Sequence, residues 1–329
     1  MVERNISLLS LDGGGVRSLS SLYILKHIME SIDGENTPRP CDYFDLIGGS
    51  GSGGLIAIML GRLKMDIDQC INAYRRLLKF VFARKRHIPF TSNLCRQSKY
   101  DGRRVESAMK AILHELGYED DVLLRDVDTS CRVFACVTDD GSKRNSAPLT
   151  SYPSKYCSNE LFKTAKVWQA GKASMSTPPL FDPVPIGPSG RQFYNSTTEA
   201  NNPVREVWIE ARGIWPSGSL DSQIQCLVSI GTGVPSIKRL NKSMFGLIKT
   251  MPKDYVDTER DMNKFIREHT ELDDASRLFR FDVPNGLAEI GLDSVDELDT
   301  IIDATQDYLA KELVYKQIQR CGIALGGFR

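Results

Sequence analysis

Two glycine-rich turns contain the residues whose types and spacing could do chemistry. The first, residues 12–17 (Asp-Gly-Gly-Gly-Val-Arg), follows a short apolar run, and the second, residues 49–53 (Gly-Ser-Gly-Ser-Gly), follows another. The second turn fits a nucleophile elbow, a sharp strand-to-helix turn with the pattern Gly-x-Ser-x-Gly that lifts one side chain above the sheet edge. Its apex here is Gly51, which has no side chain to lift.

The first turn is predicted to bind an anion through Gly13, Gly14, Gly15 and Arg17. Glycines let the backbone approach closely, and the free N–H groups at the start of a helix point at negative charge. A dinucleotide fingerprint would need a glycine where Ser18 stands, and a plain tight turn is a simpler interpretation. The second glycine-rich turn favours an oxyanion hole, because an acyl-transfer site needs both elements.

Short apolar runs alternate with amphipathic stretches, which predicts an α/β fold with a mostly parallel sheet covered by helices on both faces. Strands are expected at residues 6–11, 44–47, 131–138, 224–230 and 278–283. Helices are expected over about residues 18–32, 65–82, 101–117, 162–176, 203–215 and 294–320, with capping boxes at Asp66 and Ser294. No repeat or linker interrupts the chain, so residues 1–329 are predicted to form a single domain.

Composition excludes several classes of function. Lys+Arg and Asp+Glu both number 42, so net charge favours neither nucleic acid nor a strongly anionic partner. No apolar run approaches the ~18–20 residues of a membrane span, and the N-terminus lacks the apolar segment of a signal peptide. The 8 cysteines lack metal-ligand spacing, which favours reduced, buried thiols. We therefore expect a cytoplasmic protein, peripheral to membranes at most, without metal, cofactor or nucleic acid; the oligomeric state stays open.

Residues 10–18 (SLDGGGVRS) and 45–63 (DLIGGSGSGGLIAIMLGRL) together resemble the patatin-like phospholipase family. Three later segments resemble that family in the same order: residues 167–184, 193–211 and 229–233. The resemblance covers nearly the whole chain. It implies a patatin-like three-layer α/β sandwich and an intracellular member of fungal type.

Members of this family hydrolyse lipid esters with a serine nucleophile and an aspartate base, while the first glycine loop holds the oxyanion. In this sequence residues 13–15 and Arg17 match that loop, although Ser18 replaces a glycine. Gly51 stands where the serine belongs, and Asn195 stands where the aspartate belongs. Glycine cannot attack an ester, and asparagine takes up no proton at neutral pH. The resemblance thus implies a pseudoenzyme that keeps a pocket for a lipid acyl chain and has a lipid-binding or regulatory role.

Two other functions remain open. Ser50 or Ser52 could substitute as the nucleophile of an active ester hydrolase, although neighbouring positions on a strained turn point in different directions. A nucleotide- or phosphate-binding protein could use the turn at residues 13–15.

The basic and aromatic stretch Phe80–Phe90 suits peripheral contact with anionic lipid. A helix end whose basic residues complement the helix dipole is the simpler interpretation of the same stretch. The 4 histidines lie outside the matched motifs, so surface or structural roles are expected.

Overall fold

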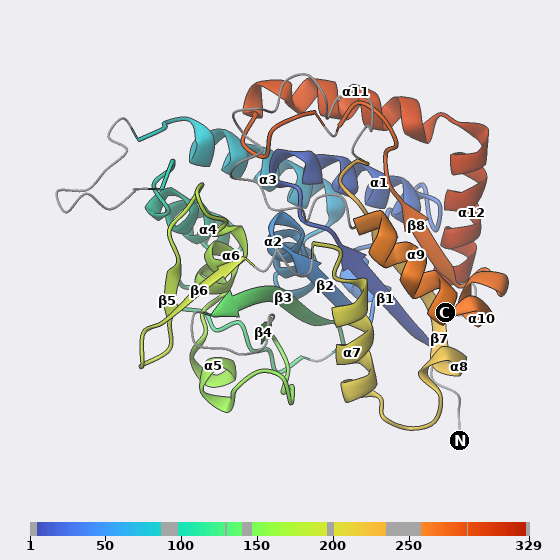
Figure 1. Cartoon of the computed structure of the whole chain (residues 1–329), viewed down its shortest axis with the longest axis horizontal. Helices are drawn as coiled ribbons and strands as arrows, with labels where there is room; N and C mark the ends of the chain where they lie inside the picture. Colours follow the sequence, from blue (N-terminus) through green and yellow to red (C-terminus); the bar gives the residue numbers. More distant parts are fainter. Residues whose placement is uncertain are drawn as a thin grey trace.

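A single mixed sheet of eight strands runs through the computed structural model, which describes residues 5–86, 98–128, 130–139, 147–195, 201–234, 258–287 and 289–326. The strand order is β5-β6-β3-β2-β1-β7-β8, with β4 paired to β3 (Figure 1). Five strands are parallel: β1 (Ile6–Leu11), β2 (Leu46–Ser50), β3 (Arg132–Asp139), β7 (Ile224–Ile230) and β8 (Leu278–Phe281). Three short strands are antiparallel to their neighbours: β4 (Ala147–Thr150), β5 (Val184–Ile186) and β6 (Arg191–Asn195).

An apolar core lies on each face of the sheet, so its central strands are buried on both faces. Leu8 and Leu46 face one core, and Leu9 and Ile47 face the other, as the two-residue period of a strand requires. The larger core takes side chains from α1 (Ser18–Glu30), α2 (Ser52–Ala57), α3 (Ile67–Phe82), α4 (Arg103–Glu115), α5 (Asn159–Thr164), α6 (Val167–Met175), α11 (Leu298–Leu309) and α12 (Glu312–Gly326). The smaller core takes them from α7 (Val204–Ile214), α8 (Leu220–Gln223), α9 (Thr258–Glu268) and α10 (Thr270–Asp274). Helix α7 packs against β2 and β1 (Figure 1).

The predicted fold class is confirmed: the protein is an α/β sandwich with a mostly parallel sheet and helices on both faces. The capping box of α3 is also present, since the Asp66 side chain accepts from the N–H of Gln69, and the Gln69 side chain accepts from the N–H of Asp66. Strands β4, β5 and β6 were not predicted, because they are short and carry little apolar alternation. The predicted helix 162–176 is divided between α5 and α6.

The last predicted helix is wrong in its start and its continuity. Residues 294–320 contain a 3₁₀ turn, then α11, then α12, and Ser294 makes no side-chain cap hydrogen bond. All seven cysteines in the described ranges are buried and outside disulfides, as expected; Cys95 falls outside these ranges. Within the described part of the chain, no helix has both the length and the apolar character to cross a membrane.

The order of the strands determines where a site can form. From β1 the chain continues into β2 on one side, whereas β7 lies on the other side, so the strand order reverses at β1. In open α/β sheets ligands bind at the carboxyl ends of strands beside such a reversal. Both glycine-rich turns follow strands at this edge, because residues 12–15 leave β1 and Gly51 leaves β2.

Candidate functional site

The elbow predicted at Gly51 is present. Gly51 joins β2 to α2 with φ +56° and ψ −129°, a conformation that side chains adopt only under strain. Its carbonyl accepts a hydrogen bond from Ser174 Oγ at 2.6 Å, which fixes the turn against α6. Gly53 lets α2 start close to the first loop, because a Cβ there would lie 2.2 Å from the carbonyl oxygen of Leu11. The backbone of a nucleophile elbow is therefore held in place without a nucleophile at its apex.

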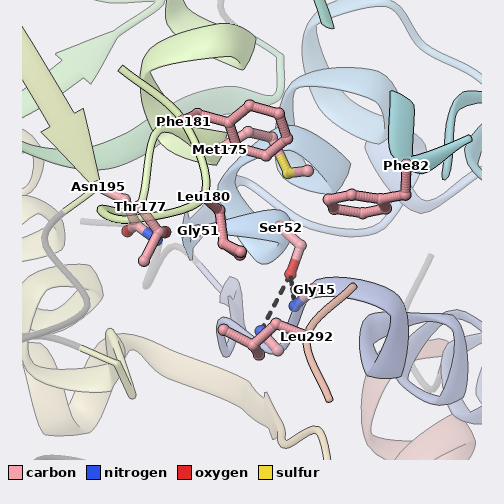
Figure 2. A pocket seen from close by; sticks show the side chains of 11 residues that line it. Gly15, Gly51, Ser52, Phe82, Met175, Thr177, Leu180, Phe181, Asn195 and Leu292 are labelled. Atoms are coloured by element: carbon pink, nitrogen blue, oxygen red, sulfur yellow. Dashed lines mark hydrogen bonds between the residues drawn. The ribbon is translucent and has the colours of Figure 1, made fainter. Parts of the chain in front are cut away.

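Asn195 lies directly beside that apex (Figure 2). A Cβ built on Gly51 would be 2.9 Å from Asn195 Nδ2 and 3.6 Å from its Cγ. The amide Nδ2 donates to Thr177 Oγ1 at 2.8 Å, while the buried Oδ1 has no hydrogen-bond partner among the described residues. The backbone N–H of Asn195 donates to the carbonyl of Ser176 at 2.8 Å and thereby holds the end of β6 against the segment after α6. Gly51 and Asn195 are 144 residues apart in the sequence, and the fold brings them together at this point.

The N–H groups of the first glycine loop already have acceptors within the protein. The N–H of Gly13 donates to the carbonyl of Asn201 at 3.2 Å. The N–H groups of Gly14 and Gly15 both donate to Ser52 Oγ, at 3.0 and 2.8 Å (Figure 2). The three amides predicted to bind an anion therefore bind protein oxygen atoms in this structure.

Ser52 has no hydrogen-bonding capacity left for catalysis. A hydroxyl has two lone pairs and one proton, and the lone pairs of Ser52 accept from Gly14 and Gly15. Its proton must then go to Ser18 Oγ, which lies 2.6 Å away. Ser18, the residue that replaces the family's glycine, is thus the acceptor that completes the hydrogen bonding of Ser52. This arrangement suits a structural hydroxyl rather than a nucleophile.

Ser50 points to the other face of the sheet. A Cβ on Gly48 would meet Phe134 and Val207 in the smaller core, and Ser50 lies two residues further along the same strand. Ser50 is 0% exposed, and within the described part of the chain its Oγ has no hydrogen-bond partner. Ser50 does not line the cavity at Gly51, whereas Ser52 does.

Arg17 is buried, and its Nε donates to the carbonyl of Gly14 at 3.4 Å. It does not line the cavity, so its placement gives no support to the predicted role in anion binding. It supports the backbone of the loop instead. The sequence reasoning did not single out Ser174 and Thr177, which fix Gly51 and Asn195, although both lie in the segment 167–184 that matched the family.

Replacing Ser52 by alanine should lower the free energy of unfolding by about 1–3 kcal/mol, because the N–H groups of Gly14 and Gly15 would lose their acceptor. Urea denaturation measures this change. The exposed Ser222 gives a matched control, and Ser222→Ala should change the free energy by less than about 0.5 kcal/mol. Equal effects of the two substitutions would contradict the role assigned to Ser52.

The cavity at the apex is small, with a volume of about 30 Å³. This is room for about two water molecules and not for an acyl chain. Apolar side chains close around it and around Gly51, Ser52, Thr177 and Asn195; they are Phe82, Met175, Leu180, Phe181 and Leu292 (Figure 2). Among the residues that the structure describes, the apex therefore has no open acyl pocket of the kind expected from the sequence.

The stretch Phe80–Phe90 is only partly described, since residues 87–97 lie outside the described ranges. Phe80 is exposed, with the Arg104 guanidinium 4.0 Å from its ring centroid. Phe82 is buried and packs against Tyr100 and Phe181, so it faces the cavity rather than an outer surface. The described part of this stretch therefore offers one exposed phenylalanine for membrane contact.

The three histidines in the described ranges do not line the cavity. His27 Nδ1 lies 3.1 Å from the carbonyl oxygen of Tyr23 within α1. His114 and His269 contact Asp120 and Asp221. These contacts agree with the structural and surface roles expected for them.

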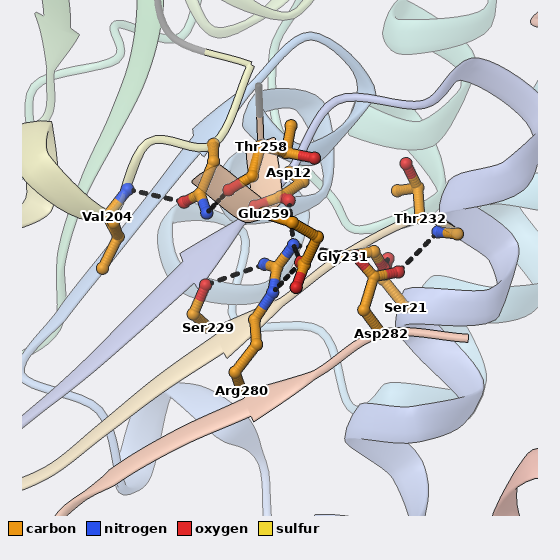
Figure 3. Close-up of polar contacts among 12 residues, drawn as sticks. Asp12, Ser21, Val204, Ser229, Gly231, Thr232, Thr258, Glu259, Arg280 and Asp282 are labelled. Carbon is orange, nitrogen blue, oxygen red and sulfur yellow. Dashed lines mark hydrogen bonds and ion pairs between the residues drawn. The ribbon is translucent and has the colours of Figure 1, made fainter. Parts of the chain in front are cut away.

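A buried charge network lies beneath the first glycine loop (Figure 3). Arg280 Nη2 lies 2.8 Å from Asp12 Oδ2, 2.8 Å from Asp282 Oδ2 and 3.0 Å from Glu259 Oε1. Its Nη1 donates to Ser229 Oγ at 2.9 Å. Burial raises the pKa of Asp12 to about 7, although the Arg280 guanidinium opposes this shift. The guanidinium of Arg280 thus pairs with three carboxyl groups, and one of them belongs to Asp12, the residue directly before the glycines of the loop.

The fold and the paired turns define an α/β protein of the kind that carries a nucleophile elbow beside a glycine loop. The chain belongs to the patatin-like phospholipase family, whose model matches residues 9–208, a range that includes both turns and Asn195. It has the family's lipid acyl hydrolase fold.

Curated relatives agree with this family. The chain is 27% identical over 296 residues to "Calcium-independent phospholipase A2-gamma" of Rattus norvegicus, covering 84% of this chain and 35% of that protein. It is 26% identical over 286 residues to "Phospholipase A I" of Arabidopsis thaliana, covering 70% and 21%. The chain thus spans about a third or less of the length of these two relatives. Among solved structures, VipD from Legionella pneumophila matches with a TM-score of 0.40 and 10% identity, covering 92% of this chain and 67% of that one.

Proposed function

We propose that this chain is a non-catalytic member of its family that binds a lipid or acyl chain in a regulatory role in lipid metabolism or signalling. One observation carries the proposal: the elbow is built, but its apex is Gly51 and its neighbour is the amide of Asn195. An ester bound there would meet neither a nucleophile nor a general base. A single domain over residues 1–329 and a cytoplasmic location, peripheral to membranes, belong to the same proposal.

The apolar walls of the cavity, rather than its volume, support the proposal that it binds a lipid. Its apolar side chains come from three separate parts of the chain, represented by Phe82, Leu180 and Leu292. Binding of an acyl chain requires these side chains to move apart. Leu180 is the most suitable position to test, because it is partly exposed and lines the cavity.

The alternative, an active ester hydrolase, requires Ser50 or Ser52 to attack. The hydrogen bonds of Ser52 and the orientation of Ser50 both argue against that role. A fluorophosphonate probe tests it directly. Labelling of the wild type at either serine, abolished by substitution of that serine with alanine, would establish the alternative.

We expect the wild-type protein to bind monomeric dihexanoyl phosphatidylcholine saturably and to release no hexanoate from it, as followed by NMR. Leu180→Trp should weaken binding by about tenfold, because the larger side chain takes up space in an already small cavity. Leu313→Trp is the matched control, since Leu313 is 82% exposed on α12. Hexanoate release by the wild type would overturn the non-catalytic part, and equal binding by both variants would overturn the assignment of the lipid to this cavity.

A further inference from the structure

A second cavity lies on the opposite face of the sheet from Gly51, between α7 and the strands β3 and β4. Its volume is about 310 Å³, roughly ten times that of the cavity at the elbow. Small-molecule sites commonly start near this size. The walls consist of apolar groups and two carboxyl groups: Phe134, Cys136, Pro148, Tyr156, Ile209, Glu206 and Glu210.

The two carboxyl groups lie together because Glu206 and Glu210 are one turn apart on α7. Glu210 is buried and accepts hydrogen bonds from Tyr152 Oη at 2.7 Å and Ser154 Oγ at 3.0 Å. Hydroxyl donors orient this carboxyl group but bring no positive charge to it. Its orientation is therefore fixed, and within the described residues it forms no ion pair, although the charge of Lys155 attracts it from farther away.

Glu206 has no hydrogen bond to another side chain among the described residues. The nearest cation in sequence, Arg205, is directed to Glu268, with Nη2 2.8 Å from Oε2. Burial raises the pKa of Glu206 to about 7; the charge of Arg205 opposes this shift, and the repulsion from Asp261 adds to it. The ionised form of a carboxyl group in this position is stabilised most by a ligand that carries a positive charge.

We propose that this cavity binds a small organic ammonium ion, with the cationic group between Glu206 and Glu210 and an apolar body against Phe134 and Ile209. The volume limits the ligand to a small molecule, and the walls require part of it to be apolar. An aromatic or short aliphatic amine satisfies both conditions. An anion is excluded because it would face two carboxyl groups. The site is independent of the elbow and of the function proposed for it.

Three probes of the same shape and different charge test the proposal: phenethylamine, 2-phenylethanol and phenylacetate. Calorimetric titration should give at least about tenfold tighter binding of phenethylamine than of 2-phenylethanol, with no binding of phenylacetate. Glu206→Gln should remove most of the preference for the amine. Glu312→Gln is the matched control, because Glu312 is an exposed glutamate on α12, and it should bind like the wild type.

Proton release gives a readout that a merely structural glutamate would not affect. The amine should drive Glu206 to its ionised form, so binding near pH 7 should release about half a proton, as measured in two buffers of different ionisation enthalpy. Glu206→Gln should abolish this release. Equal binding of the three probes, or unchanged amine affinity in Glu206→Gln, would overturn the proposal.

Discussion

The double variant Gly51→Ser/Asn195→Asp is expected to hydrolyse p-nitrophenyl acetate at least about a hundredfold faster than Gly51→Ser alone. A serine at position 51 would stand on a turn that already has the elbow conformation, next to residue 195. An aspartate at position 195 would supply the general base, which commonly contributes about 10²–10⁴-fold. An acetyl ester is chosen because only its small acyl group has to enter the cavity, which has a volume of about 30 Å³.

The matched control is Gly51→Ser/Asn195→Ala, which has the new serine but no base. Labelling of residue 51 by a fluorophosphonate should be fast in the aspartate variant and slow in the alanine variant. Adding Ser52→Ala should raise the rate further, because it frees the N–H groups of Gly14 and Gly15 to stabilise an oxyanion. If Gly51→Ser/Asn195→Asp is no faster than Gly51→Ser, these positions no longer form an acyl-transfer site.

Arg280→Met should lower the free energy of unfolding by about 3–5 kcal/mol, because it leaves the carboxyl groups of Asp12, Asp282 and Glu259 without their guanidinium partner. Urea denaturation at pH 8 measures the loss. Lys316→Met removes an exposed cation paired with Glu312 and should cost less than about 1 kcal/mol. A loss as small as that of the control would contradict the role assigned to Arg280.

The stability of the wild type and of this variant should also differ in pH dependence. The pKa of Asp12 is 3.8 in the unfolded chain and about 7 in the folded protein, so the folded state binds more protons between these values. Its contribution to stability therefore falls as the pH rises from about 4 to about 7. Without Arg280 the pKa of Asp12 rises further, so Arg280→Met should lose more stability than the wild type between pH 5 and pH 8. A parallel pH dependence of the two proteins would count against this coupling.

The sequence predicted the features that depend on neighbouring residues. The apolar run of β1, the capping box of α3 and the turn around Gly51 are local, and each is present. Short elements that form by pairing were missed: β5 has three residues, and β6 reads Arg-Gln-Phe-Tyr-Asn with little apolar alternation. The break between α11 and α12 contains neither glycine nor proline, so no local signal marks it.

At the site, family resemblance identified Gly51 and Asn195, and the structure brings these positions together. The hydrogen bonds of Ser52 could not be predicted, because the direction of a hydroxyl on a turn depends on the loop packed against it. Arg280 was also missed, since its partner Asp12 is 268 positions away in the sequence. Contacts of this range depend on the complete sheet, in which β8 lies beside β7 and β7 beside β1.

The hydroxyl of Ser52 affects how small anions in solution can bind to the first glycine loop. A phosphate or free carboxylate that reaches the first loop meets amides of Gly14 and Gly15 that already donate to Ser52. To bind there, the anion must displace a buried oxygen and give up its own hydration for the same two N–H groups. The loop is therefore expected to discriminate against small anions such as phosphate, and adding phosphate should not stabilise the protein.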